Sequence, residues 1–358
     1  MIPLDYFDRY AARYQHYKGG SWCYEDGCIY RGLAMLHAAT GDARWLDHLL
    51  RLSAPQIAAD GTLTGYRKGE FNIDHILAGR CLFHLADMTG DPRYMAAARH
   101  LADQLAQHPR TETGNYWHKQ RYPQQVWLDG LYMGLPFQIE YGQRTDQPQL
   151  VRDALTQIDT ALDLTATAGG LYVHGYDAAH SQSWADPATG RSAAVWARAL
   201  GWLAMALVDV ARLCPDTAPL PRTRALLDAI AQEQSRSGLW PQVLAQPDLA
   251  GNYEESSASA MFAYAFLRAE RLGLGPYGAN GSRALTALCD HKIEKIDGVQ
   301  QLTGICHVAG LGGFEGAYRD GSPEYYLTED IVVDDSKGVG PLMMASAERL
   351  LVRQAQSA

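Results

Sequence analysis

The sequence predicts an all-α protein folded as an (α/α)6 barrel, a closed ring of six helical hairpins. Three observations predict this fold: a repeated helix–turn–helix unit, an alternation of two kinds of helix, and aromatic loops before the first helix of successive units. A chain of 358 residues is long enough for two separate cores, but barrels commonly exceed that limit. We therefore expect a single domain over residues 1–358.

A short turn motif marks the repeat. Thr40–Asp42 reads Thr-Gly-Asp and recurs as Thr89–Asp91, each time between two helical patterns. Glycine suits the end of one helix, aspartate caps the start of the next, and Pro92 fits a first helical position. A degenerate third copy stands at Tyr141–Gln143. The unit is therefore two helices joined by a tight turn, followed by a longer loop.

The two helices of a unit differ in character. The first is rich in Ala, Leu and Met, as in RALGWLAMALVDVARL, which is typical of a helix buried on all sides. The second is amphipathic, as in PRYMAAARHLADQLAQH, and is expected to face solvent. Buried helices must stack on one another, which favours a ring over an open solenoid. We expect the first helices to begin near Glu25, Asp74, Asp129, Arg198, Ser257 and Lys337.

Composition limits the classes of partner. The formal net charge of −9 disfavours nucleic acid and anionic membranes as partners. The six cysteines are spread without a CxxC pair, which indicates free thiols in a reducing compartment. We find no signal-peptide pattern and no apolar run of about 20 residues. These features predict a cytoplasmic protein, and none of them indicates an oligomeric state.

The loops before the first helices are crowded with aromatic and charged residues. They read GGSWCYEDG, TGYRKGEFNID, NYWHKQRYPQQVWLDG, LYVHGYD, WADPATGRSAAVWAR and SGLWPQ. Aromatic faces stack on the C–H surfaces of sugars, so these loops predict a carbohydrate-binding cavity at one end of the ring. The alternative is that these aromatic residues plug the barrel.

Several segments resemble one known family in order and spacing. The segments are Phe71–His75, Trp127–Met133, Leu171–Asp177, Trp196–Trp202, Ser237–Trp240, Gly304–Gly313 and Asp335–Met344. Together they resemble the unsaturated rhamnogalacturonyl hydrolases, glycoside hydrolase family 105, from about Trp22 to Met344. The resemblance implies the same (α/α)6 fold. It also implies removal of a 4,5-unsaturated galacturonyl residue from the non-reducing end of rhamnogalacturonan oligosaccharides.

Such a substrate is a vinyl ether, and one acid suffices to hydrolyse it. Protonation of C4 creates an oxocarbenium-like centre at C5, where water adds, and the acid then serves as the base. The resemblance places Asp129 in this role. We expect a neighbouring carboxylate or burial to raise the pKa of Asp129. A helix-capping role is the structural alternative for this residue.

The resemblance also implies a set of substrate-binding residues. Asp74 matches a second acidic position, with helix capping as its alternative, and His174 is expected to contact the unsaturated ring or the attacking water. Arg198 and Trp202 lie four residues apart on one helical face. We expect Arg198 to bind the uronate carboxylate, or otherwise to pair with Asp177 or Asp186. The remaining residues expected to line the cavity are Tyr24, Lys119, Trp127 and Met133.

Other chemistries have little support in the sequence. There is no phosphate-binding glycine loop, nucleophile elbow or HExxH motif, and the histidines lack metal-ligand spacing. We therefore expect no metal and no cofactor. The alternatives are an unsaturated glucuronyl hydrolase, a sugar 2-epimerase, which would need two catalytic histidines, and a toroid without catalytic activity.

Overall fold

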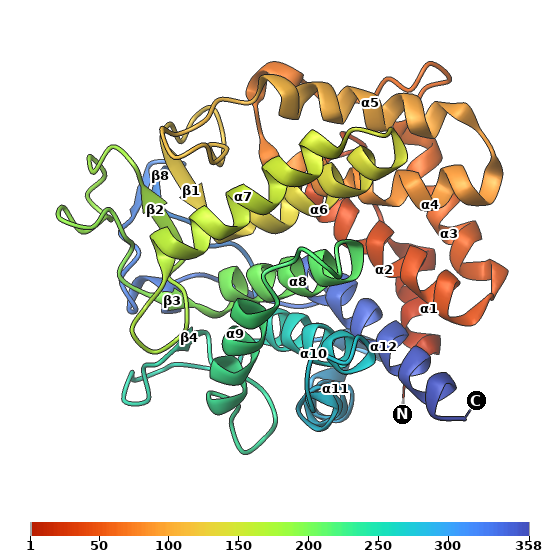
Figure 1. Cartoon of the computed structure of the whole chain (residues 1–358). Helices are drawn as coiled ribbons and strands as arrows, with labels where there is room; N and C mark the ends of the chain where they lie inside the picture. The colour runs from red at the N-terminus through yellow and green to blue at the C-terminus, as the bar shows by residue number, and fades with distance from the viewer. Residues whose placement is uncertain (1, 358) are drawn as a thin grey trace.

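The computed structural model describes residues 2–357 and consists of two concentric layers of helices (Figure 1). The inner layer contains α2 (Tyr24–Thr40), α4 (Arg80–Thr89), α6 (Leu128–Arg144), α8 (Ala197–Leu213), α10 (Ser256–Arg271) and α12 (Ser336–Ser357). The outer layer contains α1 (Leu4–Arg13), α3 (Ala43–Ser53), α5 (Pro92–Gln107), α7 (Pro148–Thr165), α9 (Leu220–Gln232) and α11 (Gly278–His291). The predicted all-α (α/α)6 barrel is confirmed.

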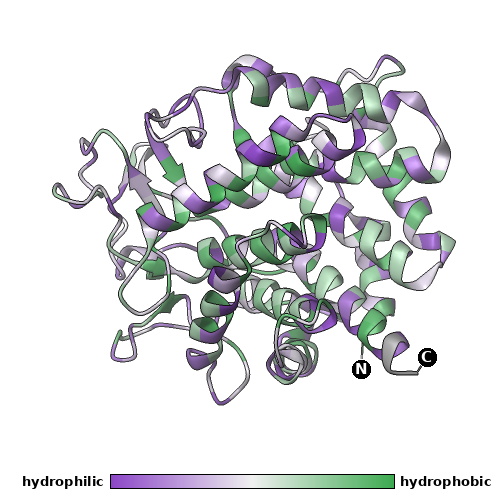
Figure 2. Cartoon of the chain, in the orientation of Figure 1, coloured by the Kyte–Doolittle hydropathy of each residue, from purple (hydrophilic) through white to green (hydrophobic). Residues whose placement is uncertain are grey.

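The inner layer is the hydrophobic core, and Figure 2 shows polar residues on the outward faces of the outer helices. In α8 every residue from Ala197 to Ala211 is buried. Five of the six inner helices begin within one residue of their predicted starts, whereas α4 begins at Arg80 rather than near Asp74. One segment differs in type, because residues Ile73–Gly79 form a 3-10 helix, η3, before α4 begins.

The helix ends follow the predicted capping in two repeats. Gly41 and Gly90 adopt left-handed conformations, and the carboxylates of Asp42 and Asp91 accept hydrogen bonds from backbone N–H groups of the next helix. The predicted position of the third turn, at Tyr141–Gln143, is wrong. Helix α6 continues past Pro136 and Tyr141 to Arg144, so the turn falls immediately before α7 rather than at Tyr141–Gln143.

The ring closes where α12 packs against α2. Gly340 on α12 faces the backbone of Cys28, and Gly32 on α2 faces Met343. A β-carbon at either glycine would collide with the neighbouring helix, so the two helices approach more closely than larger residues allow. The first and last inner helices of the chain therefore complete one barrel.

Buried ion pairs join the inner helices along the axis of the barrel. The carboxylate of Asp209 on α8 contacts the guanidinium groups of Arg80, at 2.5 Å, and Arg268. Arg268 also lies 2.8 Å from Glu348 of α12. Because a buried charge without a partner is costly, these pairs favour one relative arrangement of α4, α8, α10 and α12.

Short strands occupy the loops at the end of the barrel where the inner helices begin, on the left of Figure 1. They are antiparallel pairs: β1 (Gln125–Trp127) with β2 (Gly175–Asp177), β3 (Val195–Trp196) with β4 (Val243–Leu244), β5 (Ile293–Ile296) with β6 (Val299–Leu302), β7 (Ile305–Cys306) with β10 (Ile331–Val332), and β8 (Gly312–Phe314) with β9 (Ala317–Arg319). All six cysteines are free thiols, as predicted. Within residues 2–357, no helix has the length and apolar character needed to cross a membrane.

Closure of the ring predicts a sensitive position at Gly340. We expect Gly340→Ala to lower the free energy of unfolding by about 1–3 kcal/mol, because the added methyl group collides with the backbone of Cys28. The better helix propensity of alanine offsets about 0.5–1 kcal/mol of this loss. Chemical denaturation followed by circular dichroism measures the change.

The matched control is Gly169→Ala, at an exposed loop glycine where the nearest atom to the added carbon is 3.9 Å away. The control should unfold like the wild type. A Gly340→Ala protein as stable as this control would contradict the close packing of α12 on α2.

Candidate active site

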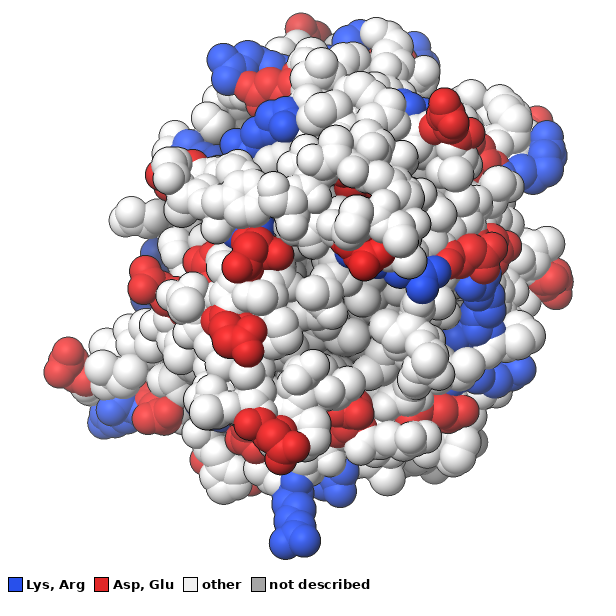
Figure 3. Space-filling view, turned by 90° about the vertical axis from the view of Figure 1, so that its left-hand side faces the viewer, with Lys and Arg blue, Asp and Glu red and all other residues white. Residues whose placement is uncertain are grey.

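A cavity of about 1010 Å³ opens at the end of the barrel that carries the strands. Figure 3 views this end, where acidic and basic side chains are both spread over the surface. Four segments line the cavity, within residues 17–25, 65–75, 118–133 and 307–319. The loops before α2, η3 and α6 therefore contribute as predicted, whereas the loops before α8 and α10 do not.

Asp129 lies in this cavity as the second residue of α6. Strand β1 leads directly into the helix, pairs with β2, and fixes the first turn beside His174, whose carbonyl accepts the N–H of Leu128 at 3.0 Å. Nε2 of His174 is 3.1 Å from Oδ2 of Asp129. Trp127 occupies the capping position, so the carboxyl of Asp129 does not cap the helix.

The pKa of Asp129 does not shift in the expected direction. Burial raises it, and the carboxylate of Asp74 adds to that effect, but His174 and His118 outweigh both and lower the pKa below its ordinary value. The position of Asp129 at the positive end of a helix dipole acts in the same direction. Without a ligand, Asp129 is therefore ionised near neutral pH.

Asp74 is the second buried carboxylate of the site. Its Oδ2 lies 2.5 Å from Nζ of Lys119, and its Oδ1 lies 3.6 Å from Nε2 of His118. Burial raises the pKa of Asp74, but Lys119 and His118 bring it down to about 2. The helix cap at this position is Asn72, which accepts the N–H of Asp74. Asp74 is thus a permanent carboxylate whose charge is balanced by Lys119.

Stacked rings form one wall of the cavity. The ring of Trp127 lies 4.2 Å from that of His118 and 4.8 Å from that of Tyr122, with interplanar angles of 18° and 26°. Burial lowers the pKa of His118 to about 4, so this imidazole is uncharged at neutral pH. His118 is not among the predicted site residues, although its place beside Lys119 in an aromatic loop was a usable signal.

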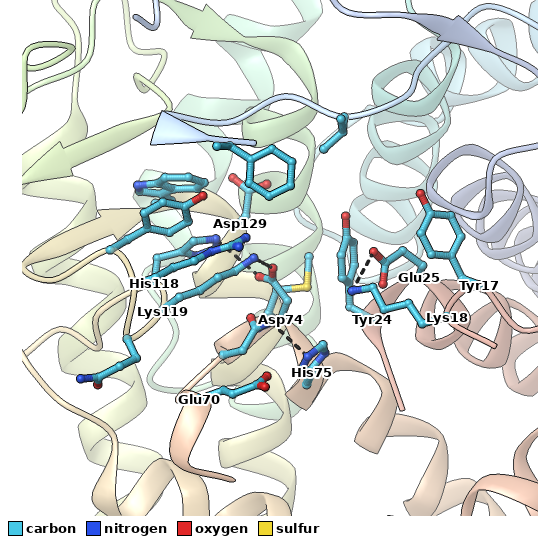
Figure 4. A pocket seen from close by; sticks show the side chains of 18 of the residues that line it. Tyr17, Lys18, Tyr24, Glu25, Glu70, Asp74, His75, His118, Lys119 and Asp129 are labelled. Atoms are coloured by element: carbon cyan, nitrogen blue, oxygen red, sulfur yellow. Dashed lines mark hydrogen bonds and ion pairs between the residues drawn. The ribbon is translucent and has the colours of Figure 1, made fainter. Parts of the chain in front are cut away.

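The opposite side of the cavity carries a second polar group of residues (Figure 4). Tyr24 and Glu25 come from the first turn of α2, and Lys18 lies 3.4 Å from Glu25. Tyr17 reaches across to His307, with 3.1 Å between its hydroxyl and Nε2. Tyr24 and Met133 line the cavity as expected. The cavity therefore has two walls of different composition, with Asp129 and Asp74 on one of them.

Arg198 and Trp202 are not brought into the cavity. The guanidinium of Arg198 donates to the carbonyl of Cys306, lies 4.6 Å from the ring of Trp196, and pairs with neither Asp177 nor Asp186 among the described residues. Trp202 is buried against Tyr132, with ring centroids 5.2 Å apart. The C-terminal segment around β7 covers the start of α8. The side chains of Arg198 and Trp202 are therefore buried in packing contacts and do not reach the cavity.

His174 contacts the carboxyl of Asp129 from behind rather than lining the cavity. Its Nδ1 lies 2.7 Å from the hydroxyl of Tyr326, which sequence reasoning missed because Tyr326 falls between the matching segments. Across the part of the chain that the structure describes, no three His, Cys, Asp or Glu side chains are arranged to hold a metal ion.

The fold and the site together define a carbohydrate-processing enzyme built on a six-hairpin barrel. The model of Glycosyl Hydrolase Family 88 matches residues 6–352. A solved family 105 glycoside hydrolase from C. acetobutylicum is 34% identical, with a TM-score of 0.88, over 96% of this chain and 99% of the other. The chain therefore belongs to the glycoside hydrolases of families 88 and 105.

Two curated relatives extend the comparison. Protein Atu3128 of Agrobacterium fabrum is 62% identical over 231 residues, which cover 62% of this chain and 99% of that protein. The unsaturated rhamnogalacturonyl hydrolase YesR of Bacillus subtilis is 27% identical over 283 residues, which cover 75% of this chain and 76% of that one.

The pair of Asp74 and Lys119 gives a test of the site's electrostatics. We expect Lys119→Met to lower the free energy of unfolding by about 3 kcal/mol at neutral pH, because it leaves a buried carboxylate without its cation. The folded-state pKa of Asp74 is depressed, so its contribution to stability is present above the unfolded value of about 3.9. That contribution is lost as the pH falls toward about 2.

The stability difference between wild type and Lys119→Met should therefore shrink on acidification below about pH 4. Denaturant titrations at several pH values measure it. Lys18→Met is the matched control, because the side chain of Lys18 is 45% exposed and its ion pair with Glu25 is worth at most about 1 kcal/mol. A deficit for Lys119→Met that does not depend on pH would contradict this pairing.

Proposed function

We propose that this enzyme removes a 4,5-unsaturated galacturonyl residue from the non-reducing end of rhamnogalacturonan-derived oligosaccharides by hydrating the vinyl ether. The observation that carries the proposal is the difference between the carboxyl groups of Asp74 and Asp129 on one wall of the cavity. Asp74 is held as a carboxylate by Lys119, which leaves Asp129 as the group suited to proton transfer. One acid that becomes a base is what vinyl-ether hydration requires.

The reaction runs in two proton transfers through Asp129. The protonated carboxyl gives its proton to C4, and the electrons of the double bond form the new C–H bond. The cation left at C5 shares the lone pairs of the ring oxygen. Water adds at C5, and the carboxylate of Asp129 takes the proton that the water loses. The resulting hemiketal opens and releases the neighbouring sugar.

The walls of the cavity suit an anionic sugar of this kind. Trp127, Tyr122 and His118 line the cavity as a largely buried aromatic stack, which would offer apolar contacts to a sugar ring. Lys119 uses one of its three donors on Asp74 and lies beside Asp129 (Figure 4), where it would attract the uronate carboxylate. Arg121 and Arg319 also line the cavity, and Arg319 lies 3.9 Å from Glu329.

The relative from Bacillus subtilis supports the choice of rhamnose as the sugar released. We expect turnover of an unsaturated galacturonyl-rhamnose disaccharide, followed by the loss of the alkene's ultraviolet absorbance, and no turnover of its saturated counterpart. Unsaturated glucuronyl disaccharides form the third arm of the panel. Comparable hydrolysis of the saturated sugar would mean that ordinary acetal cleavage takes place instead.

Asp129→Asn tests the acid directly. Asparagine keeps the shape of the side chain but can neither give nor take the proton, so we expect turnover to fall by about 10²–10⁴-fold. Binding of the substrate should largely survive, because the walls of the cavity are unchanged. Initial rates and titration calorimetry separate the two quantities.

Asp91→Asn is the matched control. The carboxylate of Asp91 caps α5, and asparagine caps a helix equally well, so this variant should keep both its stability and its turnover. Turnover by Asp129→Asn within a few-fold of the control would remove Asp129 from the proposed role.

A further inference from the structure

Tyr326 lies behind the active site, out of reach of the substrate. It belongs to the 3-10 helix η4 (Tyr325–Leu327), is fully buried, and does not line the cavity. Its ring stacks on Trp196 at 5.5 Å with an interplanar angle of 15°, and its carbonyl accepts the Nε2–H of Gln242 at 3.0 Å. The position of its hydroxyl is therefore fixed by the surrounding packing.

That hydroxyl has one hydrogen-bond partner within residues 2–357, which is Nδ1 of His174 at 2.7 Å. Burial raises the pKa of the Tyr326 phenol well above its ordinary value, with Tyr325 and Asp129 adding to the shift, so the hydroxyl keeps its proton. A buried O–H group without an acceptor is costly, and Nδ1 is the acceptor within reach. Nδ1 of His174 therefore acts as the acceptor and carries no hydrogen, so the ring proton sits on Nε2.

Nε2 of His174 faces Oδ2 of Asp129 at 3.1 Å. Within residues 2–357 both atoms are buried and neither has a hydrogen bond of regular geometry, so the 3.1 Å contact is what the structure shows between them. An Nε2–H group at that distance requires an oxygen that carries no proton on that side, so Oδ2 is the unprotonated oxygen. Oδ2 is also fully buried, whereas 15% of the Asp129 side chain is exposed. The acidic proton of Asp129 therefore belongs on Oδ1.

We propose that Tyr326 is a positioning residue that holds His174 as the Nε2–H tautomer and thereby directs the transferable proton of Asp129 to Oδ1. The catalytic part of this inference rests on the proposed function. In the reaction, the Oδ1–H bond breaks as the C4–H bond forms, and Oδ1 later takes the proton of the attacking water. His174 keeps its Nε2–H throughout and supports the carboxylate between the two transfers.

The ring nitrogens of His174 report the tautomer directly. Two-bond ¹⁵N–¹H correlation spectra of protein labelled at histidine distinguish a protonated from an unprotonated Nδ1, and the His174→Gln variant assigns the signals by their disappearance. We expect an unprotonated Nδ1 in the wild type. In Tyr326→Phe, which keeps the ring stacked on Trp196, we expect the Nδ1–H form to become populated.

The same variant should lose about tenfold in kcat with little change in KM, and its pH profile should shift, because the lost hydrogen bond affects the acid and not the binding of the sugar. Tyr277→Phe is the matched control, since it removes a tyrosine hydroxyl bonded to Asp228 at 2.9 Å on the outer layer. This control should keep the wild-type tautomer, kcat and pH profile.

A protonated Nδ1 in the wild type would overturn the proposal, as would a Tyr326→Phe enzyme with unchanged tautomer and kcat. The spectra need no substrate, so they test the tautomer whatever the enzyme hydrolyses. A failure to act on any unsaturated uronide would contradict the proposed function alone, and the spectrum would still decide the state of His174.

Discussion

Six helices without a solvent-facing side must bury one another, and the rest of this structure depends on that constraint. In α8 and α10 nearly every side chain is buried, so neither helix can lie at the edge of the molecule. A closed ring removes the edge, provided that the last helix can pack on the first. Gly32 and Gly340 permit this contact between α2 and α12. Asp209 and its arginine partners then fix how the inner helices are placed around the axis.

The ring also determines where chemistry can occur, because the inner helices all start at one end. The first turns of α2, η3 and α6 present Glu25, Asp74 and Asp129 to a common cavity, together with loops that need not pack into the core. The other half of that end is closed by the C-terminal segment. Its Cys306 engages Arg198, and its Tyr326 engages His174. The segment therefore restricts the cavity to the other side and supports Asp129 from behind through His174.

Local patterns account for what could be predicted from the sequence. Capping residues and the hydrophobic period act within a few residues, so the helix starts and the two Thr-Gly-Asp turns followed from the chain itself. The family resemblance supplied Asp129, Asp74, Lys119 and Trp127, which the structure gathers in one cavity. The contacts of Arg198 could not be predicted, because its guanidinium binds the backbone carbonyl of a residue that lies 108 positions away in the sequence. Tyr326 has no local signal either, since its role depends on a contact with His174 over 152 residues.

The low pKa of Asp129 raises the question of how an ionised carboxylate becomes the acid of the proposed reaction. The substrate itself carries a carboxylate, and bringing a second negative charge into a buried cavity disfavours the ionised form of Asp129. His118 cannot compensate, because its pKa of about 4 leaves it uncharged at neutral pH, and the single charge of Lys119 would be shared between Asp74 and the uronate carboxylate. Under the proposed function we therefore expect an anionic sugar to raise the pKa of Asp129 on binding and to couple substrate binding to proton uptake. Once the proton has moved to C4, His174 stabilises the carboxylate, which is the base that the second step needs. In the proposed reaction, Asp129 is thus ionised in the free enzyme and protonated in the complex with substrate. The negative charge of the substrate accounts for this change.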